Sequence, residues 1–245
     1  MHSIVSEYKA IGLDQINGKE LLNRFDTKFL IHREQLDGLL LQAKDNYDIL
    51  EVNGERSRFY LSRYYDTHDY LMYHHHHNGK RNRYKIRLRT YEDTADVFVE
   101  IKFKANNGKL CKYRRLIDGD SLAEIEIQEF INDYSPYDPK LLGEKLNVRY
   151  QRITLVHKNT KERVTLDYNL SFITNDKLKK LGSVIIIEVK QARPFADSDF
   201  INLLRNENYR SVDFSKYCIG TALLNEDIKK NNFKDRIAEL TNYKD

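Results

Sequence analysis

The chain has 245 residues, 40% hydrophobic and 32% charged, so it is long enough to bury a sizeable core. Its 41 Lys and Arg against 37 Asp and Glu leave a net charge of only +4, which does not indicate wholesale coating of nucleic acid. Two cysteines exclude a disulfide framework. No apolar run approaches the roughly 18 residues of a membrane span, and residues 1–8 lack the apolar core of a signal peptide. We therefore expect a cytoplasmic protein with one domain, residues 1–245.

The expected elements begin with an amphipathic helix over residues 34–45, which places Leu36, Leu39 and Leu40 on one side. Strand-like alternation between turn residues follows at residues 60–65, 82–91, 96–105, 109–117, 148–157, 162–170 and 184–191. The pair Asn107-Gly108 predicts a tight hairpin. Further helices are expected at residues 121–134, 197–208 and 232–243. This order predicts an α+β fold, with a mostly antiparallel sheet of seven or eight strands closed into a barrel and the helices packed outside it.

Several of these strands carry charge on one face. Because side chains alternate along a strand, the segment at 83–89 places Arg83, Lys85, Arg87 and Arg89 on one side. The other strands add the following residues to such faces: Glu100, Lys102, Lys104, Lys112, Arg114, Tyr150, Arg152, Arg163, Glu188 and Lys190. A half-solvated sheet is the commoner explanation for any single strand. A solvated face usually mixes charges, however, and this one is mainly cationic.

The strand at 184–191 strengthens the case for an enclosed charged face. It is apolar on both sides, yet it carries Glu188 and Lys190. A buried charge needs a partner, a metal or an ionic ligand. We therefore predict that the charges line the lumen of the barrel and bind a polyanion there. Double-stranded nucleic acid would not fit inside eight strands, whereas a linear phosphate chain or a nucleotide tail would.

At these residues the sequence resembles the VTC (vacuolar transporter chaperone) domain, a branch of the triphosphate tunnel metalloenzymes. Eight stretches carry the resemblance, in order over about residues 24–223, followed by a short helical tail: RFDTKF at 24–29, HHNGK running into RYKIRLR at 76–89, FVEIK at 98–102, KYRR at 112–115, RYQR at 149–152, RVTLD at 163–167, IEVK at 187–190 and FSKY at 214–217.

The resemblance implies an eight-stranded tunnel barrel that uses ATP to elongate inorganic polyphosphate with a divalent metal, Mn²⁺ or Mg²⁺. It implies that these residues bind phosphate: Lys28, Arg87, Arg89, Lys102, Lys112, Arg114, Arg152 and Lys216. It implies Tyr150 and Ser215 as supporting hydrogen-bond donors, and Glu188 as the metal ligand, with Glu100 a weaker candidate. The charged faces add four candidate phosphate ligands: Lys85, Lys104, Arg163 and Lys190.

Two departures from related families bear on the activity. Eukaryotic members carry a second lysine just before the Phe-Ser-Lys stretch, where this chain has Asp213. The related CYTH triphosphatases begin with a Glu-x-Glu-x-Lys motif, which this chain lacks. The second departure favours the polymerase branch, with ATP and phosphate or polyphosphate as ligands. A membrane-protein partner remains compatible with the resemblance.

Alternative readings stay open for several residues. The run His74–His77 offers a compositional hint of metal binding, but four adjacent histidines cannot all face one ion. Cys111 and Cys218 read as packed thiols, and Glu188 could form an internal ion pair with Lys190 instead of holding a metal.

At the level of function, an inorganic or nucleotide triphosphatase and a non-catalytic polyphosphate sensor are the alternatives to the polymerase. A nucleic-acid module is disfavoured, because the aromatic residues are not interleaved with the basic ones.

Overall fold

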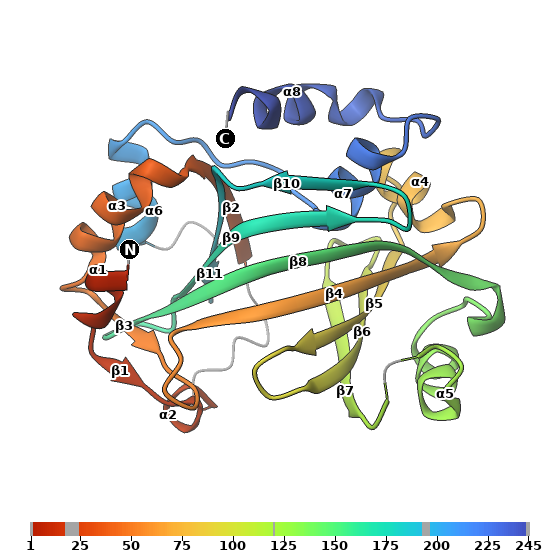
Figure 1. The fold of residues 1–245 in the computed structure, drawn as a ribbon, viewed down its shortest axis with the longest axis horizontal. Helices are drawn as coiled ribbons and strands as arrows, with labels where there is room; N and C mark the ends of the chain where they lie inside the picture. Colours follow the sequence, from red (N-terminus) through yellow and green to blue (C-terminus); the bar gives the residue numbers. More distant parts are fainter. Residues whose placement is uncertain (1, 18–24, 120, 193–196, 244–245) are drawn as a thin grey trace.

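The computed structural model describes residues 2–17, 25–119, 121–192 and 197–243. It is a mixed α+β structure built on one large, mainly antiparallel sheet (Figure 1). The main path of the sheet runs β2-β11-β9-β8-β4-β5-β6-β7. These strands are β2 (Phe25–His32), β4 (Ser57–Thr67), β5 (Arg83–Tyr91), β6 (Asp96–Lys104), β7 (Leu110–Ile117), β8 (Leu142–His157), β9 (Arg163–Ile173) and β11 (Val184–Gln191). Three short strands lie off this path: β1 (Ala10–Ile11), β3 (Tyr47–Leu50) and β10 (Leu178–Leu181).

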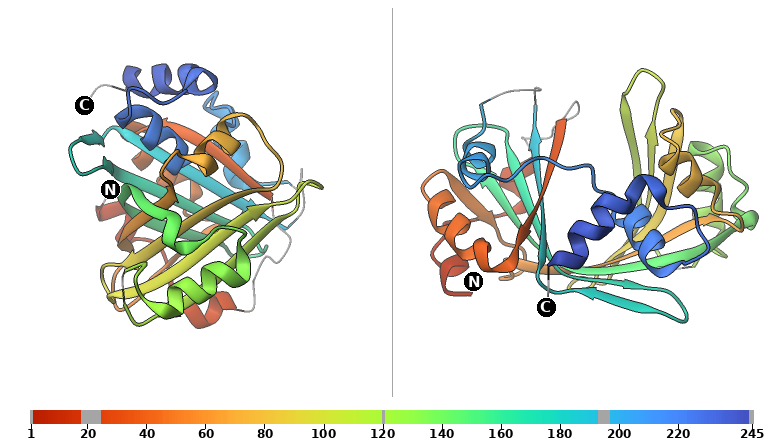
Figure 2. Two further views of the ribbon diagram at one scale, coloured as in Figure 1. Left: turned by 90° about the vertical axis from the view of Figure 1, so that its right-hand side faces the viewer. Right: turned by 90° about the horizontal axis from the view of Figure 1, so that it is seen from above.

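All seven strands expected from the sequence are present, and the eighth strand on the main path is β2. The predicted closure of the sheet is not confirmed. Among the described residues, β2 pairs only with β11 and β7 only with β6, so the two ends of the path are not joined. Seen from above in Figure 2, the strands form two arms with α7 (Lys216–Leu224) and α8 (Lys234–Asn242) between them.

The hairpin between β6 and β7 forms where the sequence predicts it. Gly108 has φ +82°, a left-handed conformation that glycine adopts without steric cost. Its backbone N–H donates to the carbonyl of Ala105, and Ala105 in turn donates to the carbonyl of Lys109. The turn sets the register of the two strands, so that Lys102 faces Lys112 and Glu100 faces Arg114.

Helices cover the sheet on both faces. The inner face is the one on which α7 and α8 lie, and the outer face is the opposite one. The outer face packs against α3 (Leu36–Ala43), α5 (Ile125–Tyr134) and α6 (Asp199–Asn206), which correspond to three predicted helices. On the inner face, α7 packs together with α4 (Leu71–His77) and α8. The helix predicted at 232–243 is α8, and it does not lie outside the sheet as expected, because Leu240 packs into the same apolar cluster as α7. The remaining helices are α1 (His2–Ser6), α2 (Leu13–Asn17) and the short 3-10 turns Arg33–Gln35, Pro139–Leu141 and Asn231–Phe233.

The position of α7 divides the inner face into two parts. Ser215 caps this helix by accepting a hydrogen bond from the backbone N–H of Cys218. The helix lies very close to the sheet at Gly220, where an added Cβ would stand 2.5 Å from Phe172 and 2.7 Å from Leu146. One part of the inner face is therefore an apolar core beneath α7. The other part, beyond the N-terminus of the helix, carries the charged side chains.

Candidate functional site

The pairing of the strands brings the predicted charges together. Across β5 and β6, Arg87 is the register partner of Glu100, and Lys85 is the partner of Lys102. The alternation predicted from the sequence therefore becomes a contiguous surface, here called the basic face. It comprises these inner-face residues of the strands: Lys28, Lys85, Arg87, Arg89, Glu100, Lys102, Lys112, Arg114, Tyr150, Arg152, Asp167, Glu188 and Lys190.

The first carboxylate of the basic face, Glu100, is enclosed by cations. Its side chain is fully buried, and its oxygens lie 2.5 Å from Arg87 Nη2 and 2.7 Å from Lys112 Nζ. Arg114 Nε and Arg89 Nη1 follow at 3.6 and 3.8 Å. Burial alone would raise the pKa of Glu100, but Arg87, Arg89 and Lys112 outweigh it and hold the pKa well below its usual range. Glu100 therefore stays ionised as a counter-ion to this cluster.

The second carboxylate, Asp167, joins the sheet to α7. Arg152 donates two hydrogen bonds to it, of 2.5 and 2.7 Å, in a bidentate arrangement. Lys216, the first residue of α7, also donates to Asp167. Burial opposes ionisation, yet these two cations lower the pKa of Asp167. On the other side of the helix N-terminus, Lys85 Nζ donates to Ser215 Oγ at 2.9 Å, so α7 is tied to both β5 and β9.

The third carboxylate, Glu188, lies on β11 between Lys28 of the neighbouring β2 and Lys190 of its own strand. Lys190 Nζ is 2.8 Å from its Oε2, and Lys28 Nζ is 3.6 Å from its Oε1. Burial would raise the pKa of Glu188, whereas Lys190, Lys28 and Lys102 hold it well below its usual range. The ion pair with Lys190 that the sequence left open is present. Glu188 remains 17% exposed, however, unlike the fully buried Glu100.

Tyr150 places a buried hydroxyl on the basic face that could bond to a ligand. Its hydroxyl is buried and has no hydrogen-bond partner among the described residues. The ammonium group of Lys216 lies 4.7 Å over its ring, and the guanidinium of Arg152 lies at 5.4 Å. Burial would raise the pKa of Tyr150, but Arg89, Arg152 and Lys216 lower it overall. A buried hydroxyl normally has a partner, so an anionic acceptor in this position would satisfy it.

The lysines of the basic face are crowded together in a buried environment. Burial, opposed by Glu100 and reinforced by Arg87 and Arg89, lowers the pKa of Lys112 to about 8. Burial also lowers the pKa of Lys85 to about 8, with Lys28 and Arg83 contributing in the same direction. Burial and Arg87 lower that of Lys102 well below its usual range. The three carboxylates therefore leave positive charge uncompensated, and a polyanion would relieve it.

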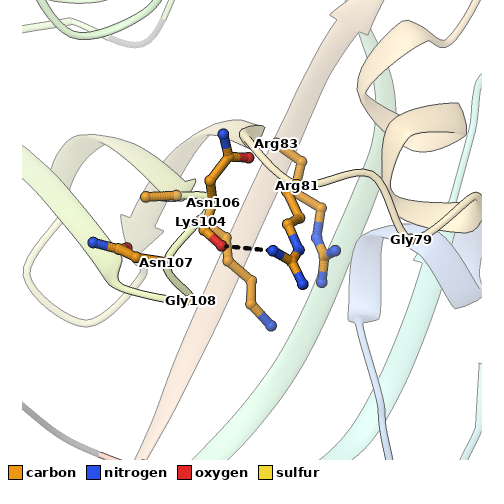
Figure 3. A pocket seen from close by; sticks show the side chains of 8 residues that line it. Gly79, Arg81, Arg83, Lys104, Asn106, Asn107 and Gly108 are labelled. Atoms are coloured by element: carbon orange, nitrogen blue, oxygen red, sulfur yellow. Dashed lines mark hydrogen bonds between the residues drawn. The ribbon is translucent and has the colours of Figure 1, made fainter.

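A cavity of about 490 Å³ continues the basic face at the end of the β5–β6 pair (Figure 3). Arg81, Arg83 and Lys104 line it, and no carboxylate does. Arg83 and Lys104 are register partners, so the cavity prolongs the row of cations on β5 and β6. Arg81 donates to the carbonyl of Asn106 at 3.3 Å, which holds its guanidinium toward the cavity (Figure 3).

The remaining predicted residues lie at the margins of the basic face. Arg163 begins β9 opposite Lys190. Asp213 is exposed just before Phe214, and Arg24 of the RFDTKF stretch lies outside the described residues. Sequence reasoning did not select Asp167, or Tyr64, which accepts a hydrogen bond from Arg87 at 2.8 Å. Alternation placed Asp167 on the charged face, but only the register with Arg152 reveals its contacts.

The geometry also bears on metal binding. Within the described ranges there is no group of three or more His, Cys, Asp or Glu side chains that could hold an ion. The histidine run forms α4, where His77 packs against Phe233 and its ring nitrogens bond with Asn78 and Asn232. A protein-only metal cage is therefore not present in this part of the chain. A site formed by one carboxylate together with substrate phosphates remains compatible with these residues.

The sequence profile of the VTC domain matches residues 23–225. The chain belongs to the VTC domain family. The resemblance inferred from the eight sequence stretches is thus confirmed. No curated protein matches the chain.

Two solved structures are similar to this VTC domain in fold. One is called "putative adenylate cyclase" and comes from Bacillus halodurans; at 14% identity and a TM-score of 0.51, the match covers 78% of this chain and 92% of the other. The second, called "putative adenylyl cyclase", is from Hippeastrum and is described as having a dominant triphosphatase activity. It matches at 14% identity and a TM-score of 0.51, over 80% of this chain and 93% of its own. At this identity the likeness shows the fold alone.

Across the described part of the VTC domain, no helix combines the length and apolar character that crossing a membrane requires.

Proposed function

We propose that this VTC domain is a metal-dependent polyphosphate polymerase, which transfers the γ-phosphoryl group of ATP to a growing inorganic polyphosphate chain. The observation that carries the proposal is the buried hydroxyl of Tyr150, which has no partner in the described part of the chain and lies within a mainly cationic face. A phosphate oxygen is the natural acceptor for a donor surrounded by Arg and Lys. Membership of the VTC domain family supports polyphosphate as the polyanion.

Phosphoryl transfer needs positioning and charge neutralisation more than covalent chemistry. We assign this role to Arg87, Arg89, Lys102 and Arg152. Arg87 and Arg152 already hold carboxylates, Glu100 and Asp167, which fix the directions of their guanidinium groups before a substrate arrives. Preorganised charge of this kind costs little reorganisation during the reaction. The attacking terminal phosphate oxygen is ionised at neutral pH, so no strong general base is required.

The N-terminus of α7 would complete the phosphate site. Lys216 and Ser215 are held toward the basic face by Asp167 and Lys85. Helix N-termini favour negative charge, because their first backbone N–H groups lack partners within the helix. Lys28, Lys112, Arg114 and Lys190 would bind further phosphates along the face. In this proposal the cavity lined by Arg83 and Lys104 receives the part of the chain that extends beyond β5 and β6.

Glu188 fits a Mn²⁺ or Mg²⁺ ion better than Glu100 does. It is part-exposed on the basic face, whereas Glu100 is fully buried among four cations. Mg²⁺ commonly takes one or two carboxylates and fills its other positions with water and phosphate oxygens, so a single protein carboxylate is sufficient. A bound ion would supply neutralisation of charge on the ATP phosphates. Glu188 would hold it, and the lysines beside Glu188 would turn to the phosphates.

A triphosphatase is the second candidate. The similar Hippeastrum structure is described as having a dominant triphosphatase activity, and both reactions use a basic site for a phosphate chain. The two functions differ in the group that attacks the terminal phosphate. In a triphosphatase it is water, whereas in the polymerase it is the end of the acceptor chain.

The test is incubation of the purified protein with ATP and Mn²⁺, followed by gel analysis of the product. Glu188→Gln is assayed beside Glu129→Gln, a control on the exposed side of α5. Long polyphosphate from wild type and the control, but not from Glu188→Gln, would support the proposal. Release of phosphate or pyrophosphate without chains would favour the triphosphatase. Binding of added polyphosphate without turnover would indicate a sensor.

A further inference from the structure

A second cavity, of about 370 Å³, lies at the opposite end of α7 from the basic face. It is bounded by the start of β8, the turn between β9 and β10, and the C-terminal end of α7. Its size is within the range of small-molecule sites. None of the residues assigned to phosphate binding lines it.

The charge of this cavity is opposite to that of the basic face. Its lining includes two lysines and four carboxylates, which are those of Glu144, Asp176, Glu226 and Asp227. The C-terminal end of a helix adds partial negative charge. The cavity is therefore negative in a chain whose net charge is +4, and it would attract a cation.

A buried hydroxyl independently points to a ligand. Thr221 is 2% exposed and lines the cavity, and its Oγ1 has no hydrogen-bond partner among the described residues. A buried hydroxyl without a partner is uncommon in a native structure, because desolvation is costly. A donor group of a ligand in the cavity would satisfy it as an acceptor.

The cavity already accommodates ammonium groups from the protein itself. Lys177 Nζ lies 2.7 Å from Glu226, and the hydrogen bond with Glu226 and the charges of Asp227 and Asp176 raise the pKa of Lys177. Lys145 Nζ lies 4.8 Å over the ring of Tyr70, in a cation–π contact. The ammonium group of Lys177 thus interacts with three of the four carboxylates, and the lining keeps a net negative charge that a further cation could neutralise.

The rest of the lining distinguishes an organic cation from a metal ion. Leu146, Ile173 and Leu224 provide apolar surface against which methylene groups could pack. The described carboxylates do not gather into a group of three that could hold a metal. Separated carboxylates around an apolar floor suit a chain with several ammonium groups.

We propose that this cavity binds an aliphatic polyamine, with ammonium groups at Asp176 and Asp227, a further N–H donated to Thr221 Oγ1 and methylene groups over the apolar floor. The proposal does not depend on the polymerase activity, because binding is measured without ATP. It predicts a one-to-one complex with spermidine that butylamine, which carries a single ammonium group, does not form.

The experiment is calorimetric titration of the full chain with spermidine, butylamine and Mg²⁺, each alone, at physiological salt. The test variant is Asp176→Asn with Asp227→Asn, and the matched control is Asp133→Asn on the exposed face of α5. We expect the double variant to bind spermidine about tenfold more weakly, since two ammonium–carboxylate pairs are lost, and the control to match wild type.

A second variant separates ligand binding from folding. Thr221→Val removes the unpartnered hydroxyl with little change of shape, so it should not lower the melting temperature without ligand. It should weaken spermidine binding roughly two- to tenfold, the range for one hydrogen bond. Equal binding of spermidine to wild type and both variants, or none to wild type, would overturn the proposal. Mg²⁺ binding that is lost in the same variants would also overturn it, in favour of a metal site.

Discussion

Replacement of Glu100 by Gln tests how the basic face is held together. The side chain is fully buried and lies within 4 Å of Arg87, Arg89, Lys112 and Arg114. Removing one partner of a buried ion pair costs about 3–5 kcal/mol, because the other charge is left buried without compensation. For a chain of this size each kcal/mol lowers the melting temperature by roughly 2–4 °C. Glu100→Gln should therefore melt roughly 6–20 °C below wild type.

The assay is thermal unfolding of both proteins with and without tripolyphosphate in the absence of metal, and separately with Mn²⁺ alone. Because the variant exposes more uncompensated cations to the ligand, tripolyphosphate should raise its melting temperature more than that of wild type. A variant as stable as wild type, whose stabilisation by Mn²⁺ is lost, would refute this reasoning. That result would make Glu100 a metal ligand and not a counter-ion.

Three further predictions concern the basic face and the helix α7 beside it. Tyr150→Phe should leave the melting temperature within about 1 °C of wild type, since its hydroxyl has no described partner, yet weaken tripolyphosphate binding roughly tenfold in calorimetry. Affinity for tripolyphosphate should fall as pH rises through about 8, because the pKa values of Lys85 and Lys112 in the free protein are about 8 and a bound anion would raise them. An affinity that stays constant from pH 7 to 9 would contradict this prediction. Gly220→Ala should lower the free energy of unfolding, measured by chemical denaturation, by about 1–3 kcal/mol, because its Cβ would stand 2.5 Å from Phe172. The control is Gly38→Ala on α3, where the added Cβ meets open space and should not destabilise the protein.

The alternation of charge could be recognised from the sequence because a strand repeats every two residues. Arg87 and Arg89 fall on one face of any strand that contains them, and the structure places both beside Glu100. The partners of each carboxylate could not be predicted in the same way. They depend on the register between strands, which is fixed by turns and by irregularities such as the shift between Arg149 and Gln151 in the pairing of β8 with β9.

Two elements on which the site depends were missed for a physical reason. Helix α7 is buried almost all round, from Tyr217 to Leu224, so its sequence has no polar face to reveal a helical period. Ser215 was the available signal, since serine is a favourable N-cap. Strand β2 has exposed and half-buried residues in its first half and buried ones in its second, which obscures the alternation of a strand.

The pairing of β2 with β11 has a consequence for folding kinetics. It joins a strand near the start of the chain to one near its end, so the intervening loop must be closed before Lys28 can reach Glu188. Sheets dominated by such distant pairings fold slowly. We expect the basic face to be completed late, after the folding barrier. A polyanion that recognises the completed face would act mainly by slowing unfolding, and so prolong the lifetime of the native state.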